Sequence, residues 1–346
     1  MDIEEIIKSA EENKASDIHL SVGTVPRFRI HGQLKVVSDH IITPQDTKNM
    51  VLKLLPPVSR KALERRGDVD FATTIPQVGR IRVNVFMQRG CYSLAIRLFP
   101  TKLPTPKALG IPDSVEEALH KKRGMFLITG PTGSGKSTTL AALINVINQT
   151  ESLHVITIED PIEFLYHHNK ALINQREIGI DTPSFAMGIK AAMRENPDVI
   201  VISNLYDIES INMAIAAADA GHMVLSSLPT AGVINTIEHL VDIFPTYQQQ
   251  QIRVQLSNAL KAVISQELLR EEDESLNQIA AFEILFNNAE VAEAIREDKL
   301  AALEDIMERN KKNGMQTMDN AIYDMYLKRY ITKETLVKYS KKPIPI

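Results

Sequence analysis

The 346-residue sequence has no tryptophan and only one cysteine, Cys91. A single cysteine excludes an internal disulfide and a zinc site built from four cysteines. No uninterrupted apolar run approaches the roughly 18 residues that a membrane-spanning helix needs. The first residues, MDIEEIIKSAEENKAS, lack the basic region and the small-residue cleavage site of a signal peptide. We therefore expect a cytoplasmic protein with no membrane span.

Long runs of lysine or arginine are also absent, and the formal net charge is -4. A protein that moves along nucleic acid needs a basic stripe and aromatic residues on which bases stack. We therefore expect no nucleic-acid partner. The composition, 44% hydrophobic and 24% charged, is typical of a globular protein, and the length predicts more than one domain.

Residues 1–99 predict an α+β domain. Apolar residues recur at helical spacing near its start. The segment PRFRIHGQLKVV alternates like two strands joined at Gly32, and residues 80–99 read as a hairpin that turns at 88–90. Residues 100–112 contain four prolines, which predicts a stiff, extended linker without regular structure.

Residues 113–346 predict an α/β domain with a mainly parallel sheet. Short apolar strands alternate there with helical patterns, as in βαβ units. From Phe244 onward the pattern is predominantly helical, apart from a strand at QIAAFEILF. The expected strands lie at 125–129, 154–159, 198–203 and 222–227.

The motif GPTGSGKST matches G-x-x-x-x-G-K-[ST], follows an apolar strand and opens a helix. Glycines let backbone N–H groups turn onto phosphate, and the helix N-terminus adds a favourable dipole. Lys136 would reach the β- and γ-phosphates of ATP or ADP, and the Ser137 hydroxyl would bind Mg²⁺. The alternative is a glycine-rich turn that only caps a helix. The expected nucleotide-binding residues are Gly130, Pro131, Thr132, Gly133, Ser134, Gly135, Lys136, Ser137 and Thr138.

Ten segments, in the family's order, together resemble the PilT family of ATPases that drive type IV pilus retraction. They are SDIHLSVGTVPRFRIHGQL, GRIRVNVFMQRG, GPTGSGKSTTLAALI, ITIEDPIEF, LINQREIG, NPDVIVI, AAADAGHMVLSSL, HLVDIFP, AVISQELL and GMQTMDNAIYD. Related pilus-extension and type II secretion ATPases usually carry a longer N-terminal region and a tetracysteine metal site. Neither is present in this sequence, which favours the retraction branch.

The resemblance implies a PAS-like N-terminal domain and a RecA-like P-loop ATPase core with a helical C-terminal segment. It also implies a homohexamer with ATP at the domain interfaces, working in twitching motility at the inner face of the cell membrane. The implied partners are a pilus platform protein of the inner membrane and a second PilT-like ATPase.

By the same resemblance, Glu159, Asp160 and Glu163 match the family's acidic box, in which Glu163 would help to position water or metal. Carboxylates at a strand end are also commonly solvated or cap the next helix.

Arg82 and Arg97 match arginines that reach nucleotide in related ATPases, and a guanidinium can clasp γ-phosphate oxygens. Arg80 and Arg89 are weaker candidates for this role. Most arginines on strands are simply exposed. His222 matches the first histidine of the family's His box, although a histidine at a strand start is as often a structural hydrogen-bonding residue.

The sequence departs from the family where hydrolysis is expected. Asn204 stands where the family has the glutamate that polarises water, and Tyr206 stands where it has arginine. Pro229 replaces the second histidine of the His box. Asparagine can bind a water molecule but cannot accept its proton as a carboxylate does.

These departures lead us to expect a divergent PilT-like motor subunit that binds ATP and hydrolyses it slowly. The alternative is a hydrolysis-deficient regulatory or structural subunit that modulates an active pilus ATPase. A RecA-like DNA translocase is disfavoured by the net charge and by the lack of tryptophan.

Overall fold

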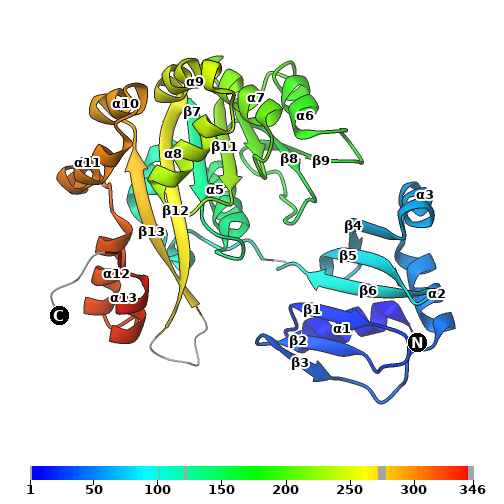
Figure 1. The fold of residues 1–346 in the computed structure, drawn as a ribbon. Coiled ribbons are helices and arrows are strands. Elements are labelled where there is room, and N and C mark those ends of the chain that lie inside the picture. Colours follow the sequence, from blue (N-terminus) through cyan, green and yellow to red (C-terminus); the bar gives the residue numbers. More distant parts are fainter. Residues whose placement is uncertain (1, 101, 121–122, 272–277, 342–346) are drawn as a thin grey trace. The chain divides into compact units, whose positions relative to one another are not determined.

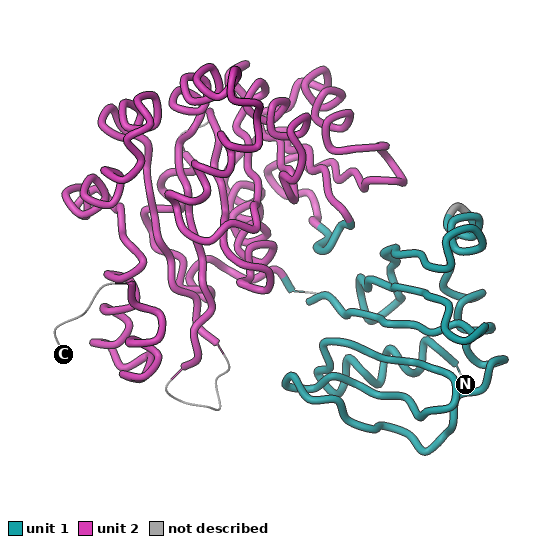
Figure 2. Tube along the Cα trace, in the orientation of Figure 1, with its two compact units in different colours: residues 1–102, 161–165 teal, residues 103–160, 166–346 magenta. Residues whose placement is uncertain are grey.

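The computed structural model describes residues 2–100, 102–120, 123–271 and 278–341. The chain divides into two compact units (Figure 1, Figure 2). Unit 1 comprises residues 1–102 and 161–165, and unit 2 comprises residues 103–160 and 166–346. None of the described helices combines the length and apolar character needed to cross a bilayer.

Unit 1 is built on a six-stranded antiparallel sheet in the order β3-β2-β1-β6-β5-β4. Its helices are α1 (Ile3–Glu12), α2 (Pro44–Leu54) and α3 (Pro57–Arg66). Its strands are β1 (Asp17–Leu20), β2 (Arg27–Ile30), β3 (Gln33–Val36), β4 (Asp68–Ile75), β5 (Gly79–Gln88) and β6 (Cys91–Leu98).

Both hairpins expected in unit 1 are present, and each has a two-residue turn. His31 and Gly32 join β2 to β3 with φ of 49° and 77°, and Arg89 and Gly90 join β5 to β6 with φ of 50° and 75°. Two successive positive φ values are typical of the type I′ turn, whose twist matches that of the strands it joins.

Unit 2 is built on a seven-stranded sheet in the order β13-β12-β7-β11-β10-β8-β9, in which β13 is an antiparallel edge strand and the others are parallel. Its strands are β7 (Gly124–Thr129), β8 (His154–Glu159), β9 (Leu172–Glu177), β10 (Val199–Ile202), β11 (Met223–Leu228), β12 (Leu260–Arg270) and β13 (Gln278–Phe286). Its helices are η1 (Lys107–Leu109), α4 (Asp113–Leu119), α5 (Lys136–Thr150), α6 (Phe185–Ala192), α7 (Ile208–Asp219), α8 (Val233–Asp242), α9 (Thr246–Ala259), α10 (Ala289–Arg296), η3 (Leu300–Ala302), α11 (Leu303–Arg309), η4 (Lys311–Asn313), α12 (Met318–Leu327) and α13 (Lys333–Tyr339).

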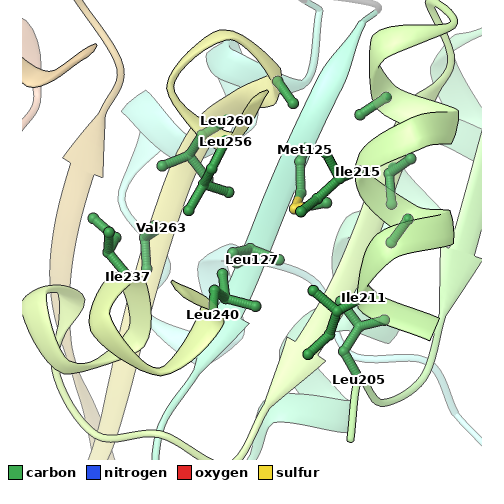
Figure 3. Close-up of a cluster of buried hydrophobic side chains, with 14 of the residues drawn as sticks. Met125, Leu127, Leu205, Ile211, Ile215, Ile237, Leu240, Leu256, Leu260 and Val263 are labelled. Carbon is green, nitrogen blue, oxygen red and sulfur yellow. The ribbon is translucent and has the colours of Figure 1, made fainter. Parts of the chain in front are cut away.

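Alternate residues of the buried strands face two different hydrophobic clusters. Met125 and Leu127 of β7 pack with residues of α7, α8 and α9, as the close-up in Figure 3 shows. Phe126 and Ile128 point to the opposite face, where α5 contributes Leu140 and several of its neighbours. Helices therefore cover both faces of this sheet, which explains why its strands read as continuous apolar runs.

The expectation of a predominantly helical region after Phe244 is wrong for β12. This strand lies between β7 and β13 and is buried over most of its length, so its sequence shows no alternation of polar and apolar residues. Helix α9 also runs directly into it at Leu260, with no glycine or proline to mark the change. Strand β9 was not expected either. In the linker, η1 forms a short turn where no regular structure was expected.

Candidate functional site

The carboxyl ends of four parallel strands meet at one edge of the unit 2 sheet. Thr129 pairs with Leu228, Ser226 pairs with Ile202, and Ile202 pairs with Ile158. The segments that follow β7, β11, β10 and β8 therefore leave the sheet side by side. In open α/β sheets this edge is where ligands bind.

The P-loop, which is the phosphate-binding motif at residues 130–138, joins β7 to α5 at this edge. Gly135 is the residue before α5 and has φ of 86°, a left-handed conformation that glycine adopts without strain. Gly130 has φ of 143°, and a Cβ there would collide with the carbonyl oxygen of Gln266 and with Ser134 Oγ. The loop is therefore packed so closely against β12 that a side chain at Gly130 has no room.

Lys136 begins α5 and is half-buried beside its own loop. Its Nζ donates to Gly130 O and to Pro131 O, both at 2.9 Å. Burial lowers the pKa of Lys136 below its ordinary value. Within the described ranges, no carboxylate forms an ion pair with it, so its charge is available to an anion.

Ser134 supplies a second indication of a ligand. Its side chain is 3% exposed, and within the described part of the chain its Oγ has no hydrogen-bond partner. A buried hydroxyl without a partner costs free energy, which a phosphate oxygen at the helix N-terminus could recover.

The residues present fit Mg²⁺ only together with a nucleotide. The described residues contain no group of three or more histidine, cysteine or acidic side chains that could hold a metal ion. Mg²⁺ usually keeps several waters and binds through one or two protein groups plus substrate phosphates. Ser137, exposed in the first turn of α5, is the residue that would contribute one such group.

A cavity of about 470 Å³ adjoins the P-loop within unit 2. It reaches from Gly135, Thr138 and Thr139 to apolar side chains of η1, β12 and β13, and Tyr330 also lines it. Its lining includes Leu109, Leu268, Ile279 and Ala280. Lys107, Gln266, Glu271 and Gln278 add polar groups to the lining. A cavity with apolar walls and a few polar groups beside a phosphate loop can take a flat aromatic ring such as a nucleotide base.

Glu159 and Asn204 both lie at the carboxyl edge. Glu159 ends β8, and its Oε1 accepts from Thr157 Oγ1 at 2.6 Å and from Gln175 Nε2 at 3.0 Å. Asn204 follows β10, and its side-chain amide lies 3.0 Å from Ser227 Oγ, which donates its proton to Ser203 O at 2.6 Å. The neighbouring Asp160 donates its backbone N–H to Ser203 Oγ at 3.3 Å. The structure thus places Glu159, Asp160 and Asn204 at the ends of the adjacent strands β8 and β10.

His222 lies elsewhere. It precedes β11 at the amino end of the strand, whereas the P-loop lies at the carboxyl end of the neighbouring β7. Its Nδ1 is 2.9 Å from Pro197 O, and its carbonyl accepts from Gly124 N. His222 therefore ties strand starts together and is not part of the carboxyl-edge site of its own chain.

In unit 1, Arg82 and Arg97 are directly opposite each other on β5 and β6. Arg82 Nε donates to both carboxylate oxygens of Asp70, at 3.1 and 2.9 Å, and Arg97 Nε donates to Asp17 Oδ1 at 3.1 Å. A cavity of about 240 Å³ opens beside the four charged groups. Like charges in a cross-strand pair destabilise a sheet, so each arginine here has its own carboxylate neighbour.

The other unit 1 candidates have different contacts and positions. Arg80 Nε donates to Ile162 O at 2.9 Å, in the same segment, 161–165, that contains the half-buried Glu163. Arg89 lies in the turn between β5 and β6. The arginine pair belongs to unit 1 and the P-loop to unit 2. That these arginines reach a nucleotide bound at the P-loop stays a prediction.

Residues that hold the carboxyl-edge loops in place escaped the sequence analysis. Ser265 Oγ on β12 accepts from Gly232 N at 2.8 Å, and Glu283 Oε2 on β13 accepts from Val233 N at 2.8 Å, just after the loop that contains Pro229. Gln266 contacts the P-loop. The sequence signal for these residues is the polar triplet SQE inside the apolar segment AVISQELL. The same triplet would also fit the solvent-facing side of a helix, so it did not identify them.

Glu283 also makes the stability of the protein depend on pH. Burial raises its pKa above the ordinary value, and nearby Glu304 raises it further, while the backbone N–H groups of Val233 and Met318 and the charge of Lys341 oppose the shift. A raised folded-state pKa means that the native protein binds more protons than the unfolded chain. The stabilising contribution is therefore complete below about pH 4.5 and is lost as the pH rises through the raised pKa.

We expect Glu283→Gln to remove this dependence. The unfolding free energy of the wild type minus that of the variant should fall with rising pH above pH 4.5, by at most about 1.4 kcal/mol per pH unit. Urea unfolding followed from pH 4.5 to 8 measures it. Parallel curves for the two proteins would contradict the assignment.

Comparison with known proteins identifies the family of this chain. A family profile described as "Type II/IV secretion system protein" matches residues 1–340. The chain is 36% identical to the type IV pilus retraction ATPase PilT of Pseudomonas aeruginosa over 343 residues, 99% of each chain. It is 39% identical over 309 residues to a twitching motility protein of Neisseria gonorrhoeae, covering 89% of this chain and 82% of that one.

A crystal structure of the pilus retraction motor PilT with bound ADP superimposes with a TM-score of 0.92. It is 44% identical and covers 99% of this chain and 98% of that one. The chain therefore belongs to the type II/IV secretion system protein family, as a PilT-like member of it.

Proposed function

We propose that this chain is an ATP-binding motor subunit of the PilT type, which serves type IV pilus retraction and twitching motility. The observation that carries the proposal is the P-loop at the carboxyl edge of the parallel sheet. Its half-buried Lys136 lacks a carboxylate partner among the described residues, and its Ser134 hydroxyl is buried without a partner. Both features suit a phosphate chain.

The nucleotide would bind with its phosphates on residues 130–138, with Mg²⁺ held by Ser137 and the phosphates. Its base would enter the cavity lined by Leu109, Leu268 and Tyr330. Glu159 and Asn204 border the reaction centre in this proposal, and Glu163 assists from segment 161–165. Bound Mg²⁺ supplies charge stabilisation to the phosphates, while the loop and Lys136 orient them.

We further propose a homohexamer in which unit 1, a PAS-like domain, closes over the RecA-like unit 2. Arg82 and Arg97 then reach the γ-phosphate. The pilus platform protein of the inner membrane and a second PilT-like ATPase are the proposed partners. This places the protein at the inner face of the cell membrane.

A second candidate function rests on Asn204 and Pro229. If neither position supports proton transfer from water, the chain is a nucleotide-binding regulatory subunit that modulates an active pilus ATPase. Steady-state ATP turnover by the purified protein separates the two functions, because a motor must hydrolyse ATP continuously under load.

Nucleotide binding is the first step to test. We expect Lys136→Ala to weaken MgADP binding by about 10- to 100-fold, because a charge-assisted hydrogen bond contributes about 1.5–3 kcal/mol. Titration calorimetry measures the change. Lys170→Ala is the matched control, since Lys170 Nζ contacts Thr150 O at the far end of α5. This helix has 15 residues, so Thr150 lies about 21 Å from Lys136. Equal affinities of the two variants would refute the site.

A further inference from the structure

We propose that Gln266 of β12 is a positioning residue that holds the P-loop in its phosphate-binding conformation. The proposal rests on nucleotide binding at residues 130–138. It adds a residue outside the motif, 130 positions away from Lys136 in the sequence. Gln266 reaches the loop because β12 pairs with β7 in parallel, with Ser265 opposite Thr129, the last residue before the loop.

The side-chain amide of Gln266 bridges two parts of the site. Its Nε2 donates to Ser134 O at 2.6 Å, and its Oε1 accepts from Thr139 Oγ1 at 2.6 Å. The amide orientation is unambiguous, since a backbone carbonyl can only accept and must therefore face the nitrogen. Gln266 is 3% exposed and Thr139 is fully buried, so water does not compete for these bonds.

The hydrogen bond from Gln266 to Ser134 O sets the direction of the Gly135 N–H group. In a trans peptide the C=O and N–H of one unit point in opposite directions. Because Gln266 holds the carbonyl of the Ser134–Gly135 peptide on the β12 side, the Gly135 N–H is turned away from β12. Backbone N–H groups of this loop are the groups that cradle phosphate.

Glycine makes such a restraint necessary. Gly133 and Gly135 have φ of 85° and 86°, and glycine passes readily between positive and negative φ. The Ser134–Gly135 peptide could therefore rotate between several orientations if nothing held it. A Cβ at Gly135 would lie 2.9 Å from Gln266 Nε2, so the amide also fills the space beside the loop. Ordering the loop before binding lowers the entropy that binding has to remove.

The test compares the same substitution at two positions, Gln266 on β12 and Gln316 in the segment that forms a bridge with Ile284 of β13. Gln266→Met keeps the volume but loses both hydrogen bonds. Gln316→Met is the matched control, because Gln316 Nε2 also donates to a backbone carbonyl, Phe282 O at 2.9 Å, and Phe282 pairs with Gln266 on the far side from the P-loop. MgADP is the probe, titrated by calorimetry, with thermal unfolding recorded in parallel.

We expect Gln266→Met to bind MgADP about tenfold more weakly than the wild type, while Gln316→Met binds like the wild type even if both unfold at lower temperature. A purely structural role would lower stability in both variants and leave both affinities unchanged, which would overturn the proposal. If the wild type itself binds no MgADP, the proposed function fails, and this inference fails with it.

A second variant tests the same bridge from the helix side, which covers the case that Gln266→Met does not fold. Thr139→Val keeps the shape of the side chain and removes the hydroxyl donor, and we expect binding to weaken several-fold. Thr139→Ser retains the donor and should restore the affinity. Equal affinities of the valine and serine variants would overturn the proposal.

Discussion

Changing both Arg82 and Arg97 to alanine should lower ATP turnover by about 10³-fold or more and leave MgADP affinity nearly unchanged. An arginine that neutralises charge on the departing phosphoryl group contributes about 10³–10⁵ in rate. The two residues are 15 positions apart in the sequence but directly opposite each other on β5 and β6. Asp70 and Asp17 hold the two arginine side chains in place.

Single-turnover hydrolysis measures this effect even in a slow enzyme. The matched control is Arg65→Ala with Arg66→Ala, which removes two exposed positive charges from α3 of the same unit. The control should keep the wild-type rate. The closing role of unit 1 is refuted if the Arg82 and Arg97 variant also keeps that rate.

The combined change Asn204→Glu and Pro229→His should raise ATP turnover by about 10²–10⁴-fold. That is the usual contribution of a positioned general base. Asn204 lies at the carboxyl edge, with its side-chain amide 3.0 Å from the Ser227 hydroxyl. Asn204→Glu alone should recover less, because the exposed Pro229 and Tyr206 still shape the loops after β11 and β10.

Asn204→Gln with Pro229→His is the control for this experiment, since glutamine matches glutamate in length but cannot take a proton. Only the glutamate variant should accelerate hydrolysis. Equal rates for the two variants would show that the amide at 204 is not what limits turnover. A wild-type rate as high as that of a PilT with the glutamate would contradict slow hydrolysis altogether.

Local signals in the sequence predicted much of the fold. Apolar spacing predicted α1, whose Ile3, Ile6, Ile7 and Ala10 are all buried. Glycine at a turn predicted the β2–β3 and β5–β6 hairpins of unit 1. The P-loop was readable because its glycines, lysine and hydroxyl residues act within nine consecutive positions, and the strand before it and the helix after it are adjacent in the chain.

Strand β12 was missed because its pattern reflects burial between two neighbouring strands, a property of the assembled sheet. Gln266 was missed for the same reason. Its two partners lie 132 and 127 positions away, and no spacing rule connects residues so far apart. His222 shows a different case: the sequence predicted that it lies at a strand start, and the structure shows that this is the end of β11 opposite the edge that holds the P-loop.

The sequence by itself determined the phosphate loop and, through the family resemblance, the expectation that Asn204 and Pro229 replace a glutamate and a histidine. These depend on residue identity and on short-range geometry. Only the tertiary structure decided which side chains meet at the carboxyl edge, that Arg82 faces Arg97, and that β12 supports the P-loop through Gln266. Strand order and register bring these groups together, and both arise from the packing of the whole sheet.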